Sequence, residues 1–215
     1  MAGPPACFQA PDFLEIDTVI FDIGNVISRW DIRFLYERLI GDAQELEWFL
    51  ENVVTPEWHF QHDAGRAFAE TSTELISKFP EHAELIRLFY PRFNETSPGQ
   101  VDGITALIER LKGANVSLFA ISNFSAEFWP AFRANKPVFD YFSDIVISGE
   151  HKLAKPDPAI YRLALSRFDV TSRQCLFIDD RLDNIEAGEK LGIRGHHFTD
   201  AAALERELVA LGLIG

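Results

Sequence analysis

Asp17-Thr-Val-Ile-Phe-Asp22 is the stretch that decides how this chain folds, because it carries an unbroken apolar run directly into a carboxylate. Its β-branched and aromatic residues favour a strand. A strand without polar alternation is covered on both faces, as in a parallel sheet flanked by helices. We therefore expect a buried first strand with the Asp22 carboxylate at its end.

Four more runs of this kind follow, at residues 116–122, 144–148, 175–179 and, more weakly, 194–198. Helical stretches separate them, with apolar residues three and four positions apart. These helices are expected at residues 104–111 (ended by Gly113), around Phe128 and Phe132, at 160–168, and at 185–191 (closed by Gly192). Such alternation implies right-handed crossovers between parallel strands. The predicted fold is an α/β, Rossmann-like, doubly wound parallel sheet.

Residues 29–98 interrupt this alternation, because they hold helical patterns and no convincing strand. The helices are expected at residues 31–40, with Gly41 as C-cap, and at 43–53, 66–79 and 81–93. Pro80 and the turn residues at 96–99 mark boundaries. We predict an all-helical domain over residues 29–98, inserted after the first strand of an α/β core domain formed by residues 1–28 and 99–215.

The composition is that of an ordinary globular protein, with 47% hydrophobic and 25% charged residues among 215. A formal net charge of −13 argues against nucleic acids and anionic membranes as partners, since both reward clustered lysine and arginine. No apolar run reaches the roughly 20 residues that span a bilayer. The oligomeric state stays open, and a monomer is compatible with this composition.

The two cysteines, Cys7 and Cys175, predict no disulfide framework and favour a reducing, cytoplasmic location. Cys175 opens an apolar run and is expected in the core. Residues 1–11 lack the basic head and the apolar segment of a secretory signal. We expect them to form a loose leader.

Polar residues stand at the ends of three predicted strands: Asp22, Ser122 and the pair Asp179-Asp180. In an open parallel sheet, ligands bind outside the carboxyl ends of the strands, so these side chains should converge there. Lys155 follows a fourth strand after a short loop. Just beyond it, Asp157 is expected to cap a helix that has Pro158 at its first position.

Such a cluster suits phosphate chemistry. Neighbouring carboxylates stay ionised together only with a cation, and a small set of oxygen ligands suits Mg²⁺. A carboxylate beside a phosphate can attack phosphorus and form an aspartyl-phosphate that water then cleaves. The Lys155 ammonium, the Ser122 hydroxyl and the Asn123 backbone N–H would stabilise the phosphoryl oxygens of a small phosphorylated substrate.

Four ordered segments resemble the motifs of the haloacid-dehalogenase-like (HAD) hydrolases: Phe21-Asp-Ile-Gly-Asn-Val26, Ile121-Ser-Asn123, Lys155-Pro156 and Phe177-Ile-Asp-Asp-Arg-Leu-Asp183. The helical segment lies where the C1-capped subgroup of that family has its cap domain. The Asp-x-Gly-Asn-Val start and the Asp-Asp-x-x-Asp-Asn-Ile run are similar to the branch that includes bacterial α-D-glucose-1-phosphate phosphatases. The resemblance implies a phosphatase, with sugar phosphates as one candidate substrate class.

The resemblance also assigns roles to residues. It implies that Asp22 is the nucleophile and a metal ligand, together with Asp180 and the backbone carbonyl of Gly24. It implies that Ser122 and Lys155 bind phosphate.

Two further acidic residues of the last motif would lie beside the metal site. The resemblance gives Asp179 and Asp183 as these neighbours. Asp183 would hold either Lys155 or a metal-bound water.

One position departs from the family pattern. Most phosphatases of this family carry an acid/base aspartate two residues after the nucleophile, and here Gly24 stands there. General acid/base assistance is typically worth about 10²–10⁴ in rate. The chain could thus be a silent phosphate-binding or partner-binding relative, a hydrolytic haloacid dehalogenase, or a phosphatase with a good leaving group or another proton donor. We favour the last, since Asn25 and Val26 do not fit the dehalogenase pattern.

The predicted helical domain holds one dense polar and aromatic cluster, residues 58–63. His59 or His62 could supply the missing proton, because histidine titrates near neutral pH. Packing on one helix face is the alternative for both. Arg66 is either a contact to the substrate phosphate or a solvated charge.

Overall fold

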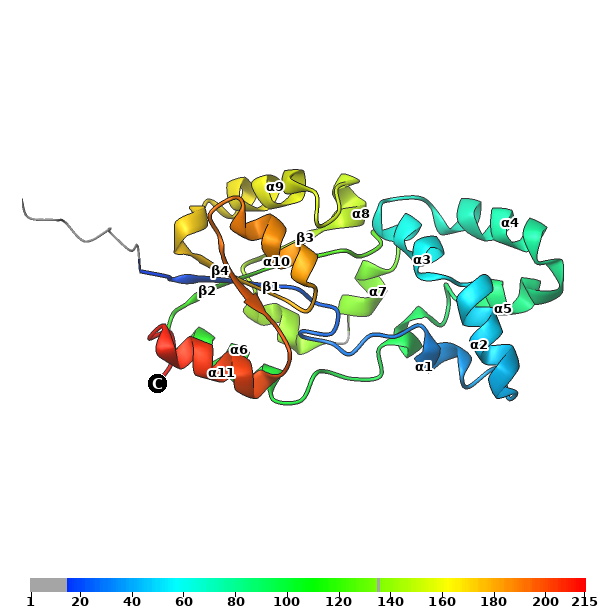
Figure 1. The fold of residues 1–215 in the computed structure, drawn as a ribbon, viewed down its shortest axis with the longest axis horizontal. Helices are drawn as coiled ribbons and strands as arrows, with labels where there is room; N and C mark the ends of the chain where they lie inside the picture. The colour runs from blue at the N-terminus through cyan, green and yellow to red at the C-terminus, as the bar shows by residue number, and fades with distance from the viewer. Residues whose placement is uncertain (1–14, 135) are drawn as a thin grey trace, which may run out of the picture.

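A five-stranded, wholly parallel sheet forms the centre of the computed structural model, which describes residues 15–134 and 136–215 (Figure 1). Its order is β3-β2-β1-β4-β5. The strands are β1 (Thr18–Phe21), β2 (Ser117–Ser122), β3 (Asp144–Ile147), β4 (Cys175–Asp179) and β5 (Arg194–His197). All five predicted strands are confirmed, and the predicted leader at residues 1–11, with Cys7, lies outside the described residues.

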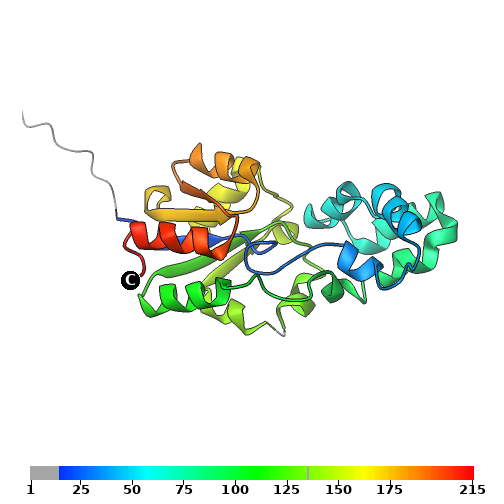
Figure 2. The same ribbon diagram turned by 60° about the horizontal axis from the view of Figure 1, so that its bottom comes forward.

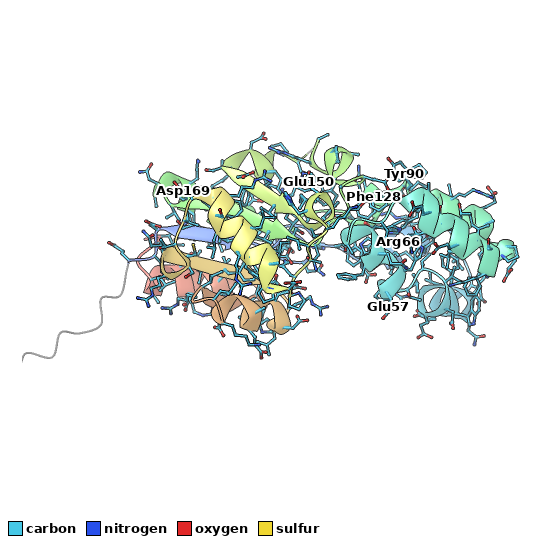
Figure 3. All side chains as sticks on the ribbon, turned by 90° about the horizontal axis from the view of Figure 1, so that it is seen from above. Glu57, Arg66, Tyr90, Phe128, Glu150 and Asp169 are labelled. Carbon is cyan, nitrogen blue, oxygen red and sulfur yellow. The ribbon has the colours of Figure 1, made fainter. Side chains whose placement is uncertain are left out.

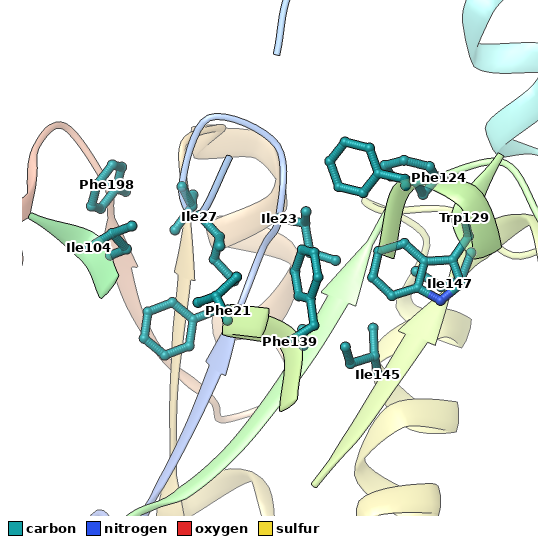
Figure 4. Packing of buried hydrophobic residues seen from close by; sticks show 14 of the residues in the cluster. Phe21, Ile23, Ile27, Ile104, Phe124, Trp129, Phe139, Ile145, Ile147 and Phe198 are labelled. Carbon is teal, nitrogen blue, oxygen red and sulfur yellow. The ribbon is translucent and has the colours of Figure 1, made fainter. Parts of the chain in front are cut away.

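Helices cover both faces of the sheet, because alternate residues of each buried strand point to opposite sides. Leu176 and Ile178 of β4 pack with helices α6 (Ile104–Gly113) and α11 (Ala201–Ala210). Cys175 and Phe177 pack with α9 (Pro158–Phe168) and α10 (Leu182–Glu189) on the other face (Figure 2). Figure 4 shows part of the hydrophobic cluster on the face that α6 and α11 cover, from Phe198 to Ile147. The doubly wound prediction is therefore confirmed, and Cys175 is buried as expected.

A group of short helices extends from one end of the sheet (Figure 1). It comprises α1 (Arg33–Tyr36), α2 (Ala43–Asn52), α3 (Pro56–Asp63), α4 (Phe68–Lys78) and α5 (Ala83–Leu88). Residues 29–98 are all described by the structure and contain no β-strand. We call α1–α5 the helical group; its assignment as a cap domain with limits at 29 and 98 stays a prediction.

The remaining elements are short and connect the others. They are α7 (Trp129–Arg133), α8 (Ser148–His151) and the 3₁₀ helices Pro80–His82, Phe93–Thr96, Pro137–Tyr141 and Ser172–Gln174. Among the described residues, no helix has the length and apolar character required to cross a membrane.

Some predicted helix limits were wrong. The helix expected at 31–40 is only the four residues of α1, and Gly41 does not cap it, because the chain after Tyr36 continues in tighter turns such as Leu39 N–H to Tyr36 O at 2.9 Å. The helix expected at 81–93 stops at Leu88 before Pro91, which lacks an N–H. The end of α10 lies at Glu189, so Gly192 serves the turn that follows.

Helix α3 was not among the helices predicted with bounds, although its start signals are present and the packing alternative for His59 and His62 placed both on one helix face. Thr55 is its N-cap and accepts from the Trp58 N–H, and Pro56 takes the first position. Its last residue, Asp63, is tied to the sheet domain because the Ser148 hydroxyl donates to the Asp63 carbonyl at 2.6 Å. Gly65 then turns the chain with φ +89°. The hydrogen bond from Ser148, the first residue of α8, thereby fixes where α3 ends.

Glycine at position 149 of α8 is required by close backbone approach. A Cβ there would lie 2.6 Å from the Ala126 nitrogen and 2.9 Å from the Phe124 oxygen. We predict that Gly149→Ala lowers the unfolding free energy by about 1–3 kcal/mol through overpacking. Urea denaturation followed by circular dichroism measures this.

The matched control is Gly113→Ala, because no described atom lies within 4 Å of a Cβ at Gly113. That change should leave the protein equally stable or slightly more stable. Equal effects of the two substitutions would contradict the packing argument.

Candidate active site

The polar strand ends meet at one cavity of about 580 Å³. Asp22 and Asp180 directly follow β1 and β4, Ser122 is the last residue of β2, and Lys155 reaches the same cavity from the loop before α9. Asn123 and Gly24 also line it. The predicted convergence at the carboxyl edge of the sheet is therefore what the structure has, as the parallel strand directions require.

Asp22 is a buried carboxylate with a defined orientation. Its side chain is 11% exposed, and Oδ1 accepts from the Ile23 N–H at 2.6 Å and from the Lys155 ammonium at 2.9 Å. Burial raises the pKa of Asp22 to about 7, Lys155 opposes the rise, and Asp179 adds to it. This is the electrostatic setting of a carboxylate that needs cations in order to ionise.

Lys155 is enclosed between two carboxylates. Its side chain is 1% exposed, and Nζ lies 2.9 Å from Asp22 Oδ1 and 2.7 Å from Asp179 Oδ2. Burial lowers the pKa of Lys155, but Asp22 and Asp179 together raise it above the ordinary value. The side chain is therefore an ammonium ion that joins the ends of β1 and β4.

The Asn123 side chain positions the Lys155 backbone. Asn123 Oδ1 accepts from the Lys155 N–H at 2.8 Å, and its Nδ2 donates to the Lys155 carbonyl at 2.9 Å. The sequence suggested only the backbone N–H of Asn123 as a functional group. These two hydrogen bonds require one acceptor and one donor on the same side chain, which an amide provides.

Asp179, rather than Asp183, holds Lys155. Asp179 Oδ1 also accepts from the Arg181 N–H at 2.8 Å, and Asn184 Nδ2 lies 3.0 and 3.1 Å from its two oxygens. Asp183 instead pairs with Arg181 at 2.7 Å, with its side chain 47% exposed. Of the two contacts predicted for Asp183, the one with Lys155 is wrong, because the first turn of α10 directs Asp183 toward Arg181 and solvent; the contact with a metal-bound water stays a prediction.

The donor atoms suit a magnesium ion. Asp22, Asp179 and Asp180 offer carboxylate oxygens within 4.8 Å of one another. Hydrogen bonds occupy both Asp179 oxygens and Asp22 Oδ1, which leaves Asp22 Oδ2 and the Asp180 carboxylate as the oxygens that could bind a metal, with Gly24 beside them. Burial and Asp179 raise the pKa of Asp180. A few hard oxygen ligands, with room for water and phosphate, are what Mg²⁺ prefers.

Of the predicted residues in the helical group, His59 alone is among the described residues that line the cavity. It is 8% exposed and stacks on Trp30, with ring centroids 4.7 Å apart. Burial lowers the pKa of His59 to about 3 and that of His62 to about 4. His62 Nε2 lies 2.6 Å from Thr71 Oγ1. Both imidazoles are neutral at pH 7 and packed, as the alternative interpretation expects.

Arg66 is not among the described residues that line the cavity, and its guanidinium pairs with Glu74 at 2.6 Å (Figure 3 labels Arg66). Its side chain is 39% exposed. The geometry is that of a surface charge, which is the second of the two interpretations given to Arg66.

Sequence reasoning missed two groups at the cavity. One is Asp63, a buried carboxyl at the end of α3. The other is an aromatic wall that comes from separate segments: Trp30, Phe60, Phe93, Phe124 and Phe132. The proximity of Asp63 to His59 one helical turn earlier was available as a signal, but burial was not.

A parallel α/β sheet with a nucleophile-type aspartate at its edge, a buried lysine and an acidic metal cluster defines a hydrolase of the HAD type. Residues 16–192 match the haloacid dehalogenase-like hydrolases, and the chain belongs to that family. Its membership of the C1-capped subgroup and its similarity to glucose-1-phosphate phosphatases stay predictions.

Two relatives that span nearly the whole chain are named as phosphatases. The chain is 27% identical over 195 residues to the sesquiterpene phosphatase astK of Aspergillus oryzae, covering 88% of this chain and 93% of that protein. It is 24% identical to D-ribitol-5-phosphate phosphatase of Bacteroides thetaiotaomicron, covering 91% and 98%. A HAD family enzyme of B. thetaiotaomicron in complex with magnesium and inorganic phosphate has the same fold, with a TM-score of 0.66 at 20% identity and coverage of 86% and 95%.

Removal of the enclosed ammonium leaves two buried carboxylates facing each other. We predict that Lys155→Met lowers the unfolding free energy by about 3–5 kcal/mol, the cost of breaking a buried ion pair from one side. Lys112→Met, at an exposed position of α6, should change it little. Denaturation in metal-free buffer measures both, and equal stability of the two variants would refute the role given to Lys155.

Proposed function

We propose that the protein is a Mg²⁺-dependent phosphatase of small phosphorylated metabolites that works through an aspartyl-phosphate on Asp22. The observation that carries this proposal is the Lys155 ammonium lying 2.9 Å from Asp22 at a cavity that Asp180 also lines. Together these groups provide a nucleophile, an anion-binding cation and a metal-binding carboxylate. The phosphatase names of two relatives that span nearly the whole chain support it.

In this mechanism the chain's own groups bind and orient the phosphate. Lys155 and the Ser122 hydroxyl contact phosphoryl oxygens, and the Asn123 bonds keep Lys155 in place. An Asp22 oxygen attacks phosphorus as the bond to the leaving oxygen breaks, and water later cleaves the acyl phosphate. Mg²⁺ bound by Asp22, Asp180 and the Gly24 carbonyl would neutralise the charge gathered there.

Asp22→Asn should abolish hydrolysis of p-nitrophenyl phosphate while the protein stays folded, because an amide cannot attack phosphorus. Chelation by EDTA should do the same to the unchanged protein, and added Mg²⁺ should restore activity. Asp102→Asn, at a position whose side chain is 92% exposed, is the control and should retain full activity.

The result decides between the proposal and its two alternatives. Phosphate esters that stabilise the protein thermally without being hydrolysed would identify a silent phosphate-binding relative. Halide release from a haloacid in the presence of chelator would identify a dehalogenase.

The cavity walls favour apolar phosphate esters over sugar phosphates as substrates. Five aromatic side chains line the cavity (Trp30, Phe60, Phe93, Phe124 and Phe132), and its volume of about 580 Å³ is that of a ligand site for a mid-sized molecule. Sugar hydroxyls placed against these rings would lose water without gaining hydrogen bonds from them. The relative named as a sesquiterpene phosphatase is consistent with an apolar substrate.

We therefore expect kcat/KM for farnesyl phosphate to exceed that for glucose 1-phosphate and ribitol 5-phosphate. Phe60→Ala should lower kcat/KM for farnesyl phosphate by about ten- to a hundredfold, since apolar burial of a large side chain is worth about 1.5–3 kcal/mol. It should leave sugar phosphates nearly unaffected. Phe60 is 45% exposed, so its loss should cost little stability.

Trp48→Ala is the matched control, because Trp48 is 44% exposed and lies on α2 away from the cavity-lining residues. A preference for the sugar phosphates, or equal effects of both substitutions, would count against an apolar substrate.

A further inference from the structure

One carboxyl group at the cavity has no part in the reaction described so far. Asp63 is the last residue of α3 and is 7% exposed. Its Oδ1 is buried without a hydrogen-bond partner among the described residues, and Oδ2 lies 3.6 Å from His59 Nε2. A buried polar atom of this kind costs stability, so its retention in the cavity calls for a function.

No cationic side chain among the described residues pairs with Asp63. His59 is a neutral imidazole, so the 3.6 Å contact is not an ion pair. Lys155 is held between Asp22 and Asp179 by short contacts. Asp63 and Asp22 line the same cavity, and the negative charge of Asp22 opposes the ionisation of Asp63. The Asp63 carboxyl is therefore expected to carry a proton.

The residues at the edge of the sheet supply no proton for the leaving oxygen. At position 24, where most phosphatases of this family have their acid/base aspartate, this chain has a glycine without a side chain. We propose that Asp63, supplied by the helical group, is the general acid and base that protonates the leaving oxygen. This inference rests on the phosphatase function proposed above and names a further residue for it.

Both half-reactions balance with Asp63 in this role. As Asp22 bonds to phosphorus, the electron pair of the breaking P–O bond passes to the leaving oxygen, which takes the Asp63 proton. The Asp63 carboxylate then accepts a proton from the water that attacks the acyl phosphate. Phosphate leaves, Asp22 is a carboxylate again, and Asp63 is protonated as at the start.

The electrostatics of the cavity agree with the geometry. Burial and the negative charge of Asp22 together raise the pKa of Asp63 to about 8, although Lys155 and a hydrogen bond from the Ser125 backbone act to lower it. The group that faces it on its own helix, His59, is uncharged. Asp63 therefore holds its proton at neutral pH.

The position of Asp63 is fixed rather than adjustable. Its carbonyl accepts from Ser148 Oγ at 2.6 Å, and two residues later Gly65 packs so closely on α8 that a Cβ would lie 3.0 Å from the Gly149 oxygen. Proton transfer needs hydrogen-bond reach to the leaving atom. These contacts hold the end of α3 at the cavity, where such reach is possible.

Leaving-group dependence tests the proposal. In Asp63→Asn, kcat/KM for benzyl phosphate, whose alkoxide must be protonated, should fall by about 10²–10⁴. The loss for p-nitrophenyl phosphate, which leaves as a stable anion, should be less than about tenfold. The ratio of the two rates does not depend on the fraction of folded enzyme, and Asp63→Ser provides a second variant. Glu84→Gln, 88% exposed in the helical group, should change neither rate.

Rescue by a second substitution makes the test sharper. No described atom lies within 4 Å of a Cβ at Gly24, and its φ is not left-handed, so an aspartate fits there. Gly24→Asp added to Asp63→Asn should restore benzyl phosphate turnover by at least about tenfold, by returning a carboxyl to the position that most of the family's phosphatases use.

Equal losses on both esters, no loss on either, or no rescue by Gly24→Asp would overturn the role of Asp63 while the phosphatase function stands. If the unchanged protein hydrolyses neither ester with Mg²⁺, the proposed function itself fails, and the role of Asp63 fails with it.

Discussion

The ion pair triad of Lys155 with Asp22 and Asp179 is the interaction on which the rest of the site depends. Three nearly inaccessible charges from different segments meet within 2.9 Å. Two carboxylates could not face one another at the ends of β1 and β4 without a cation between them. Asn123 and Asn184 serve this triad, because one positions the Lys155 backbone and the other binds Asp179. The ammonium thus holds the sheet edge together and is placed to receive an anionic substrate.

The site is divided between two parts of the chain. The sheet edge supplies the charged groups, while the helical group and its connections supply Trp30, Phe60 and Asp63. Under the role proposed for Asp63, this division would make the glycine at position 24 compatible with catalysis, since the proton would come from the other side of the cavity. It also ties chemistry to packing, because Ser148 and Gly149 of α8 hold the end of α3 in place.

Burial, more than residue type, distinguishes the side chains proposed as functional from nearby side chains of the same type. Asp63 and Asp183 are both aspartates close to the predicted site. Asp63 is 7% exposed and uncompensated, whereas Asp183 is solvated beside Arg181. Likewise, His59 and His62 lose their tendency to protonate because they are packed among aromatic rings. A side chain's chemistry here follows from what surrounds it.

The sequence alone determined the five strands and the meeting of Asp22, Ser122 and Asp180, because strand patterns are local and parallel strands present their carboxyl ends at one edge. It also indicated the helical character of residues 29–98. Only the tertiary structure decided that Lys155 pairs with Asp179 and not with Asp183, and that Arg66 pairs with Glu74. It also decided that Asp63 lies buried at the cavity. These arrangements depend on contacts between segments far apart in the chain, such as Ser148 with Asp63. Local sequence patterns do not predict such contacts.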